Sequence, residues 1–238
     1  MAGSTGTTAV ERLVDHLVGA RVDDPIGDEV AAWLSASPRF RTFAEAHRDK
    51  IRKKLRGAPE RDARRDVRAE LAVAYTLLGD RRIELDFESY GSGKVGPDFT
   101  VAVRGERAFN LEVKRIRRAP APSAIGRALL AKLRQLPPSV PNAVLLAIDD
   151  PSARLVEVDG VARALRARAD AKDEAFLADH GFAATRDFYQ RYLRLGAVVV
   201  WCEPAAGDAR ASIWVNRSAR IAVSERAAHA CLRQLRAS

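Results

Sequence analysis

The residues best suited to chemistry lie close together in the middle of the sequence: Asp98, and then Glu112 and Lys114. Asp98 falls near the start of a predicted strand over 97–103, and the other two fall in a predicted strand over 108–116. Only a short turn separates these strands, so we expect them to pair as an antiparallel hairpin. An aspartate, a glutamate and a lysine on one face of such a hairpin are the groups that metal-assisted hydrolysis of a phosphodiester requires.

The register of this hairpin is predicted from its apolar residues. Pairing the strands about Gly105 brings Phe99 opposite Leu111 and Val101 opposite Phe109, which matches apolar with apolar side chains. Because side chains alternate along a strand, the polar residues of both strands then share the other face of the sheet.

The same register brings Asp98 directly opposite Glu112, whereas a register shifted by two residues brings it opposite Lys114. Two carboxylates whose Cβ atoms are about 5 Å apart repel each other unless a positive charge lies between them. Mg²⁺ commonly takes one or two carboxylates together with waters and phosphate oxygens. Lys114 is placed to orient or deprotonate a water beside the metal. The alternative is a surface hairpin that carries a cross-strand ion pair.

A further carboxylate lies in the long helix predicted over 59–78. The apolar residues of this helix recur at helical spacing, and Glu70 falls within their stripe. A carboxylate in an apolar stripe is unfavourable without a partner. Glu70 therefore either has a partner or reaches water from the edge of the helix.

The strings Gly96-Pro97-Asp98 and Leu111-Glu112-Val113-Lys114 resemble the signature of the PD-(D/E)XK nucleases. This superfamily includes restriction endonucleases, Holliday-junction resolvases and repair exonucleases. The resemblance implies an α/β protein with the αβββαβ core of the restriction-endonuclease-like fold. The predicted elements follow this order as a helix over 59–78, strands over 82–88, 97–103 and 108–116, a helix over 123–136 and a strand over 143–149.

The resemblance also implies roles for individual residues. Asp98 and Glu112 would bind the metal, with the backbone carbonyl of Val113 as a third ligand. Lys114 would act on the attacking water. Many members carry a glutamate on the first core helix that points to the site, and Glu70 matches that position.

Basic residues near these motifs are predicted to hold nucleic acid. Family members often carry a lysine or glutamine on the helix after the second motif. Lys132 matches this position, with Gln135 as the weaker candidate, although the stem of Lys132 also suits the covering of apolar surface. The other predicted phosphate contacts are Lys94, Arg115, Arg117 and Arg118.

The charge of the chain agrees with an anionic partner. It has 40 Lys and Arg against 31 Asp and Glu, a net charge of +9, and a pI near 10.0. Such a surface attracts polyanions, of which nucleic acid is the commonest, although a GC-rich gene also favours arginine. The 2 cysteines exclude a disulfide scaffold and a cysteine-only zinc site.

We expect a helical module over 1–57 and a nuclease-like domain over 58–238, whose core spans 59–149. The last helix of the module is predicted to run from Pro38 to Gly57. The last third of the chain mixes helices and strands and forms an αβ extension. No apolar run approaches the roughly 20 residues of a membrane helix, and the N-terminus lacks a secretory signal, so we expect a cytoplasmic protein.

These features together predict a phosphodiesterase that depends on Mg²⁺ or Mn²⁺ and cuts nucleic acid, DNA rather than RNA and internally rather than from an end. Many members of the family dimerise to cut both strands, so a homodimer is compatible with this function. The alternative is a non-catalytic module on the same fold that binds nucleic acid or a protein. A third reading is an interaction protein whose charge reflects only its composition.

Overall fold

The computed structural model describes residues 8–19, 25–88, 96–117, 121–150, 155, 157–203 and 210–237. The chain divides into two compact units, Met1–Gly79 and Asp80–Ser238. The described part of the first unit is helical, and the second holds a six-stranded sheet with further helices. None of the helices within these ranges combines the length and the apolar character that a membrane crossing needs.

The first helix of the first unit begins at a capping box. The Thr8 hydroxyl accepts the backbone N–H of Glu11, whose carboxylate accepts the N–H of Thr8 in return. The single helix predicted from Pro38 to Gly57 is wrong, because the backbone leaves helical geometry at His47, with φ −111° and ψ 14°. The helices are α1 (Ala9–Val18), α2 (Pro25–Ala36), α3 (Pro38–Ala46), α4 (Arg48–Arg56) and α5 (Arg61–Leu77).

Helix α5 was predicted to open the second domain, but it belongs to the first compact unit. Its Arg68 forms an ion pair with Glu29 of α2, with 2.7 Å between Nε and Oε2. The same guanidinium lies over the ring of Trp33, which stacks on Tyr75 at 5.5 Å between ring centroids. These contacts join α5 to α2.

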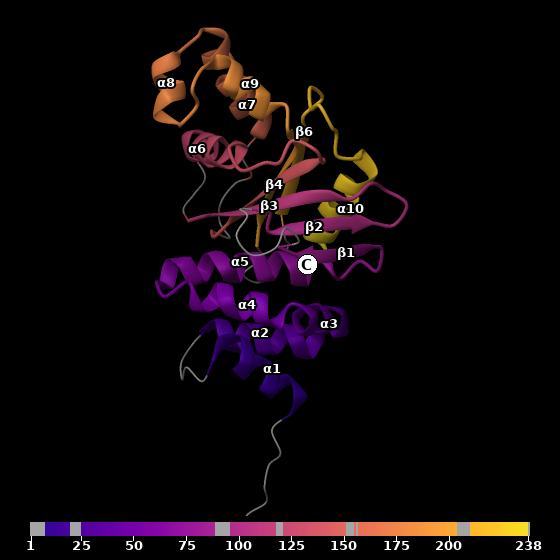
Figure 1. The fold of residues 1–238 in the computed structure, drawn as a ribbon. Coiled ribbons are helices and arrows are strands. Elements are labelled where there is room, and N and C mark those ends of the chain that lie inside the picture. The colour runs from indigo at the N-terminus through magenta and orange to yellow at the C-terminus, as the bar shows by residue number, and fades with distance from the viewer. Residues whose placement is uncertain are drawn as a thin grey trace, which may run out of the picture. The chain divides into compact units, whose positions relative to one another are not determined.

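The second unit is built on one mixed sheet (Figure 1), whose strands lie side by side in the order β1 to β6. The first three strands are antiparallel, β3 to β5 are parallel, and β6 is antiparallel to β5. The predicted mixed α/β class is therefore confirmed. The strands are β1 (Ile83–Phe87), β2 (Phe99–Val103), β3 (Phe109–Ile116), β4 (Asn142–Ile148), β5 (Leu195–Cys202) and β6 (Arg210–Val215).

Helices α6 and α7 cover one face of the parallel strands. Ile125 and Leu129 of α6 share a buried apolar cluster with Val144 and Leu146 of β4. Helix α10 packs against β5 and β6. The helices of this unit are α6 (Pro122–Leu133), α7 (Val158–Asp170), α8 (Glu174–Asp179), α9 (Thr185–Tyr192) and α10 (Glu225–Arg236).

The β2–β3 register is the predicted one, with Phe99 opposite Leu111 and Val101 opposite Phe109. All four side chains are buried. Burial of this apolar face fixes the register, because a slip by one residue would move the whole set to the other face. The alternative register, with Asp98 opposite Lys114, does not occur.

A buried asparagine fixes the start of the parallel strands. Asn142 is 0% exposed, and its Nδ2 donates to the carbonyls of Pro137 and Val140 at 2.9 Å and of Arg194 at 3.0 Å. Its Oδ1 accepts a hydrogen bond from Nδ2 of Asn110 at 3.1 Å. One side chain thus links β3, β4 and the start of β5.

The change Asn142→Ala is expected to lower the free energy of unfolding by about 2–3 kcal/mol, since it leaves buried carbonyl groups without a donor. Urea unfolding followed by circular dichroism measures the effect. Gln190→Ala, which removes an exposed amide from α9, is the control and should change stability by less than about 0.5 kcal/mol. Equal effects of the two substitutions would contradict a structural role for Asn142.

Candidate functional site

Two carboxylates face each other where the β2–β3 hairpin ends. Asp98 immediately precedes Phe99 and Glu112 immediately follows Leu111, so the observed register places the two acids opposite each other. Asp98 is 8% exposed and Glu112 is 6% exposed. The predicted acidic pair is therefore present, and it is buried.

The Asp98 carboxylate is held by the strand that it faces. The backbone N–H of Val113 donates to Asp98 Oδ2 at 2.8 Å. Alternate residues of β3 bond in the other direction, since the N–H of Asn110 donates to the carbonyl of Pro141 at 2.9 Å. The N–H and C=O of one strand residue point to the same edge, so the Val113 carbonyl also faces the Asp98 side. A Val113 carbonyl that is to bind a metal together with Asp98 must face this side.

Lys132 reaches the acidic pair from α6. Its Nζ donates in a short ion pair to Glu112 Oε1 and lies 3.2 Å from Oε1 of Gln135. The lysine side chain is 15% exposed. Both residues proposed for the helix after the second motif thus meet at one ammonium group, and this group neutralises Glu112.

The pKa of Glu112 is raised above its ordinary value. Burial is the largest cause, and the negative charge of Asp98 raises the pKa further. The charge and hydrogen bond of Lys132 lower it without reversing the direction of the shift. Burial and the charge of Asp98 therefore outweigh the ammonium of Lys132 at Glu112, and a cation held between the two carboxylates would reduce their repulsion.

Lys114 lies two residues beyond Glu112 on the same face of β3. It is half-buried, and it forms no hydrogen bond or ion pair with the residues that the structure describes. Its amine is thus not engaged by these residues, and Lys114 lies on the face of the sheet that carries the acidic pair. A lysine in this situation can bind a ligand oxygen or exchange a proton with water.

The acidic pair suits a small hard cation. No group of three or more His, Cys, Asp or Glu side chains within the described ranges converges as a metal site. Asp98, Glu112 and the carbonyl of Val113 supply only oxygen donors, which Mg²⁺ and Mn²⁺ accept and structural zinc sites rarely use. Waters and substrate oxygens would complete the coordination of such an ion.

Glu70 belongs to the first unit. The partner that its apolar position requires is Lys54 of α4, with 2.6 Å between Nζ and Oε2. Its expected role beside Asp98 and Glu112 stays a prediction.

The predicted phosphate contact of Arg115 needs correction. Its side chain is 4% exposed and pairs with Asp149, with 2.7 Å between Nη1 and Oδ2. Side-chain alternation also directs it to the face opposite Lys114, so Arg115 ties β3 to the end of β4. Arg117 follows β3 and is exposed. The other two predicted contacts, Lys94 and Arg118, lie outside the described residues.

Two acids on the strands beside β2 and β3 were not predicted. Asp86 is exposed on β1 opposite Thr100 and extends the polar face that carries Asp98. Its signal was the period-two pattern of 83–87, which fixes the face but not the neighbours. Asp149 directly follows the apolar strand β4, a position typical of site residues in parallel sheets.

No protein-family model, curated protein or solved structure matches the chain.

The raised pKa of Glu112 predicts a pH-dependent stability. Between its unfolded and folded pKa values the folded state binds more protons than the unfolded state, so the free energy of unfolding falls as pH rises through this window. Glu112→Gln removes this dependence and keeps an acceptor for Lys132. We expect the variant to be more stable than the parent at neutral pH, with the difference vanishing below the ordinary pKa of glutamate.

Urea unfolding over a pH series, without divalent cations, measures this difference. Glu84→Gln on the exposed face of β1 is the matched control and should leave the pH profile unchanged. A Glu112→Gln variant that is less stable than the parent at neutral pH would contradict the interpretation.

Proposed function

We propose that this protein is a metal-dependent phosphodiesterase that hydrolyses nucleic acid, with DNA as the substrate and internal bonds as the point of attack. The observation that supports it most is the buried pair of Asp98 and Glu112 beside two lysines. A buried acidic pair is costly for a protein, and it persists most often where its charge has a use.

The order of elements supports the same proposal. Helix α5 is followed along the chain by β1, β2, β3, α6 and β4. This is the αβββαβ order of the restriction-endonuclease-like core, which we propose for this region. Asp98 and Glu112 then stand at the two motif positions of that fold.

Each residue has a separate role in the proposed reaction. Asp98, Glu112 and the Val113 carbonyl would hold Mg²⁺ or Mn²⁺. The metal, when bound, polarises the phosphoryl group and offsets the charge that develops on it. Lys114 would orient the attacking water toward the phosphorus or take a proton from it, while the bond from phosphorus to the leaving sugar oxygen breaks and that oxygen takes a proton from solvent. Lys132 holds Glu112 in place through their ion pair.

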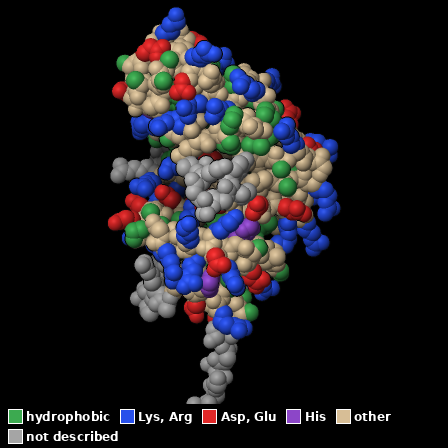
Figure 2. All heavy atoms as spheres, viewed as in Figure 1, with side chains coloured by type: hydrophobic (Ala, Val, Ile, Leu, Met, Phe, Trp, Pro, Cys, Tyr) green, Lys and Arg blue, Asp and Glu red, His purple; other side chains and the backbone are tan. Residues whose placement is uncertain are grey.

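The charge of the chain supports a nucleic-acid substrate. Its net charge of +9 favours association with a polyanion. In the first unit, Figure 2 shows basic side chains over α4, with acidic ones among them. Backbone phosphates are commonly held by such lysines and arginines. The basic residues of α4 are Arg48, Lys50, Arg52, Lys53, Lys54 and Arg56.

A second candidate is a module that binds nucleic acid or a protein without catalysis. The ion pair of Lys132 with Glu112 favours it, because an acid that is already neutralised serves structure as well as chemistry. The two candidates differ in whether DNA is cut.

The first test is cleavage of plasmid, linear duplex, single-stranded DNA and RNA in the presence of Mg²⁺. Asp98→Ala and Glu112→Ala are each expected to lower the rate by about 10²-fold or more, because each removes a metal ligand. Chelation should abolish cleavage, and Glu84→Ala on the exposed face of β1 should cut as the parent does. If parent and variants bind DNA equally and none cuts, the binding module is the correct function.

The second test asks whether Lys114 takes a proton from the attacking water. Lys114→Ala should lower kcat by about 10²–10⁴-fold, the usual contribution of a general base. Lys114→Arg keeps the positive charge but holds its proton at every working pH, so it should be impaired to a similar degree. The pH profile of kcat for the three proteins measures this. Parental activity in Lys114→Arg would contradict proton transfer and leave Lys114 as a group that orients water.

A further inference from the structure

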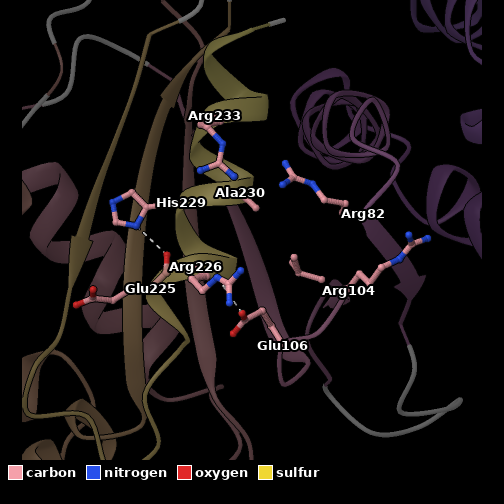
Figure 3. A pocket seen from close by; sticks show the side chains of 9 residues that line it. Arg82, Arg104, Glu106, Glu225, Arg226, His229, Ala230 and Arg233 are labelled. Atoms are coloured by element: carbon pink, nitrogen blue, oxygen red, sulfur yellow. Dashed lines mark hydrogen bonds and ion pairs between the residues drawn. The ribbon is translucent and has the colours of Figure 1, made fainter.

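A pocket of about 480 Å³ lies in the second unit, apart from the acidic pair. It is bounded by the end of β2 and by one face of α10 (Figure 3). Val103, which lines it, lies five residues beyond Asp98, about 17 Å along the strand at about 3.3 Å per residue. The lining residues are Arg82, Val103, Arg104, Glu106, Glu225, Arg226, His229, Ala230 and Arg233.

Secondary structure places the basic residues of this pocket. Arg226, His229 and Arg233 recur at intervals of three and four residues, so they share one face of α10. Arg82 precedes β1, and its carbonyl accepts the N–H of Arg104 at 2.9 Å, which joins the two strands beside the pocket.

Glu106 fixes the turn between β2 and β3 against the helix. Its Oε2 accepts a short hydrogen bond from the hydroxyl of Ser224, the N-cap of α10. Its Oε1 lies 3.5 Å from Nε of Arg226, whose side chain is 90% exposed. The two walls of the pocket are thereby joined at this end.

Positive charge is in excess at the other end. Arg82 bonds both carboxylate oxygens of Asp80, with 2.6 Å between Nη2 and Oδ2 and 3.1 Å between Nε and Oδ1. Arg233 forms no hydrogen bond or ion pair with the described residues. The side chains of Arg82 and Arg233 point toward each other across the pocket, whereas Arg104 points away from α10 (Figure 3).

Two guanidinium groups that face each other repel unless an anion lies between them. Asp80 offsets the charge of Arg82, and the charges of Arg82 and Arg233 both lower the pKa of Asp80. Arg233 has no carboxylate at ion-pair distance among the described residues and interacts with Asp80 only at longer range. Guanidinium groups bind phosphate oxygens through paired, charge-assisted hydrogen bonds, and a pocket of this volume accepts a ligand of nucleotide size.

We propose that this pocket binds a phosphate group between Arg82 and Arg233. The phosphate belongs either to a free anion such as pyrophosphate or a nucleotide, or to the backbone of a nucleic acid. The site is separate from Asp98 and Glu112 and does not depend on the proposed hydrolysis.

The experiment measures binding of inorganic pyrophosphate and of a short single-stranded DNA, without divalent cations so that nothing is cut. Arg233→Ala should weaken pyrophosphate binding about tenfold or more, because it removes a charged hydrogen-bond donor. Arg233→Glu should abolish binding, because it places a negative charge where the anion would bind. Alanine is well tolerated in an exposed helix, so α10 should remain folded. Arg186→Ala, at an exposed position of α9, is the matched control and should bind as the parent does.

The DNA measurements separate the two sources of phosphate. If the backbone occupies the pocket, Arg233→Ala weakens DNA binding, lowers its salt dependence by roughly 0.7 in log–log slope, and pyrophosphate competes with the DNA. If DNA binding is unchanged while pyrophosphate binding falls, the pocket takes a free anion. The proposal is wrong if both Arg233 variants bind both probes as the parent does. If the Arg233 variants lose pyrophosphate binding and the parent protein cuts no DNA, the phosphate site is supported and only the proposed nuclease function is contradicted.

Discussion

Repulsion between two buried carboxylates is the interaction around which the second unit is arranged. Asp98 and Glu112 face each other with one ammonium, that of Lys132, bonded to Glu112. Three elements must be in place at once for this to hold: both strands of the hairpin, and α6, which carries the lysine. The net effect still disfavours the ionised form of Glu112, as its raised pKa records. Apolar packing on the other face of the same strands, by Phe99 and Leu111 among others, therefore has to keep the acids together.

The hydrogen bond from Val113 to Asp98 explains how this arrangement remains ordered. Pro97 has no N–H to donate, and β2 begins only at Phe99. The Asp98 carboxylate accepts the backbone N–H that a longer β2 would have paired. One side chain thus terminates the ladder, satisfies a buried donor and supplies an oxygen to the site.

Local patterns in the sequence were sufficient to predict the hairpin and its register. Period-two alternation of apolar residues determines the faces, so the meeting of Asp98 with Glu112 follows from near neighbours alone. Partners that are distant in sequence could not be found in this way. Arg115 was assigned to nucleic acid because its ion pair with Asp149 depends on how β3 and β4 align. The break at His47 likewise interrupts a stripe with continuous helical spacing, and the pocket beside α10 joins segments more than a hundred residues apart.

The ammonium of Lys132 acts as a built-in counter-ion for Glu112. Any divalent ion that arrives from solution has to compete with it, so part of the attraction of the two acids is already spent. If the acidic pair holds a divalent ion as proposed, this competition would lower its apparent affinity for the ion, and occupancy would rise with the concentration of free cation. A displaced ammonium would stay tethered to α6, as a positive charge beside any anion that such an ion held.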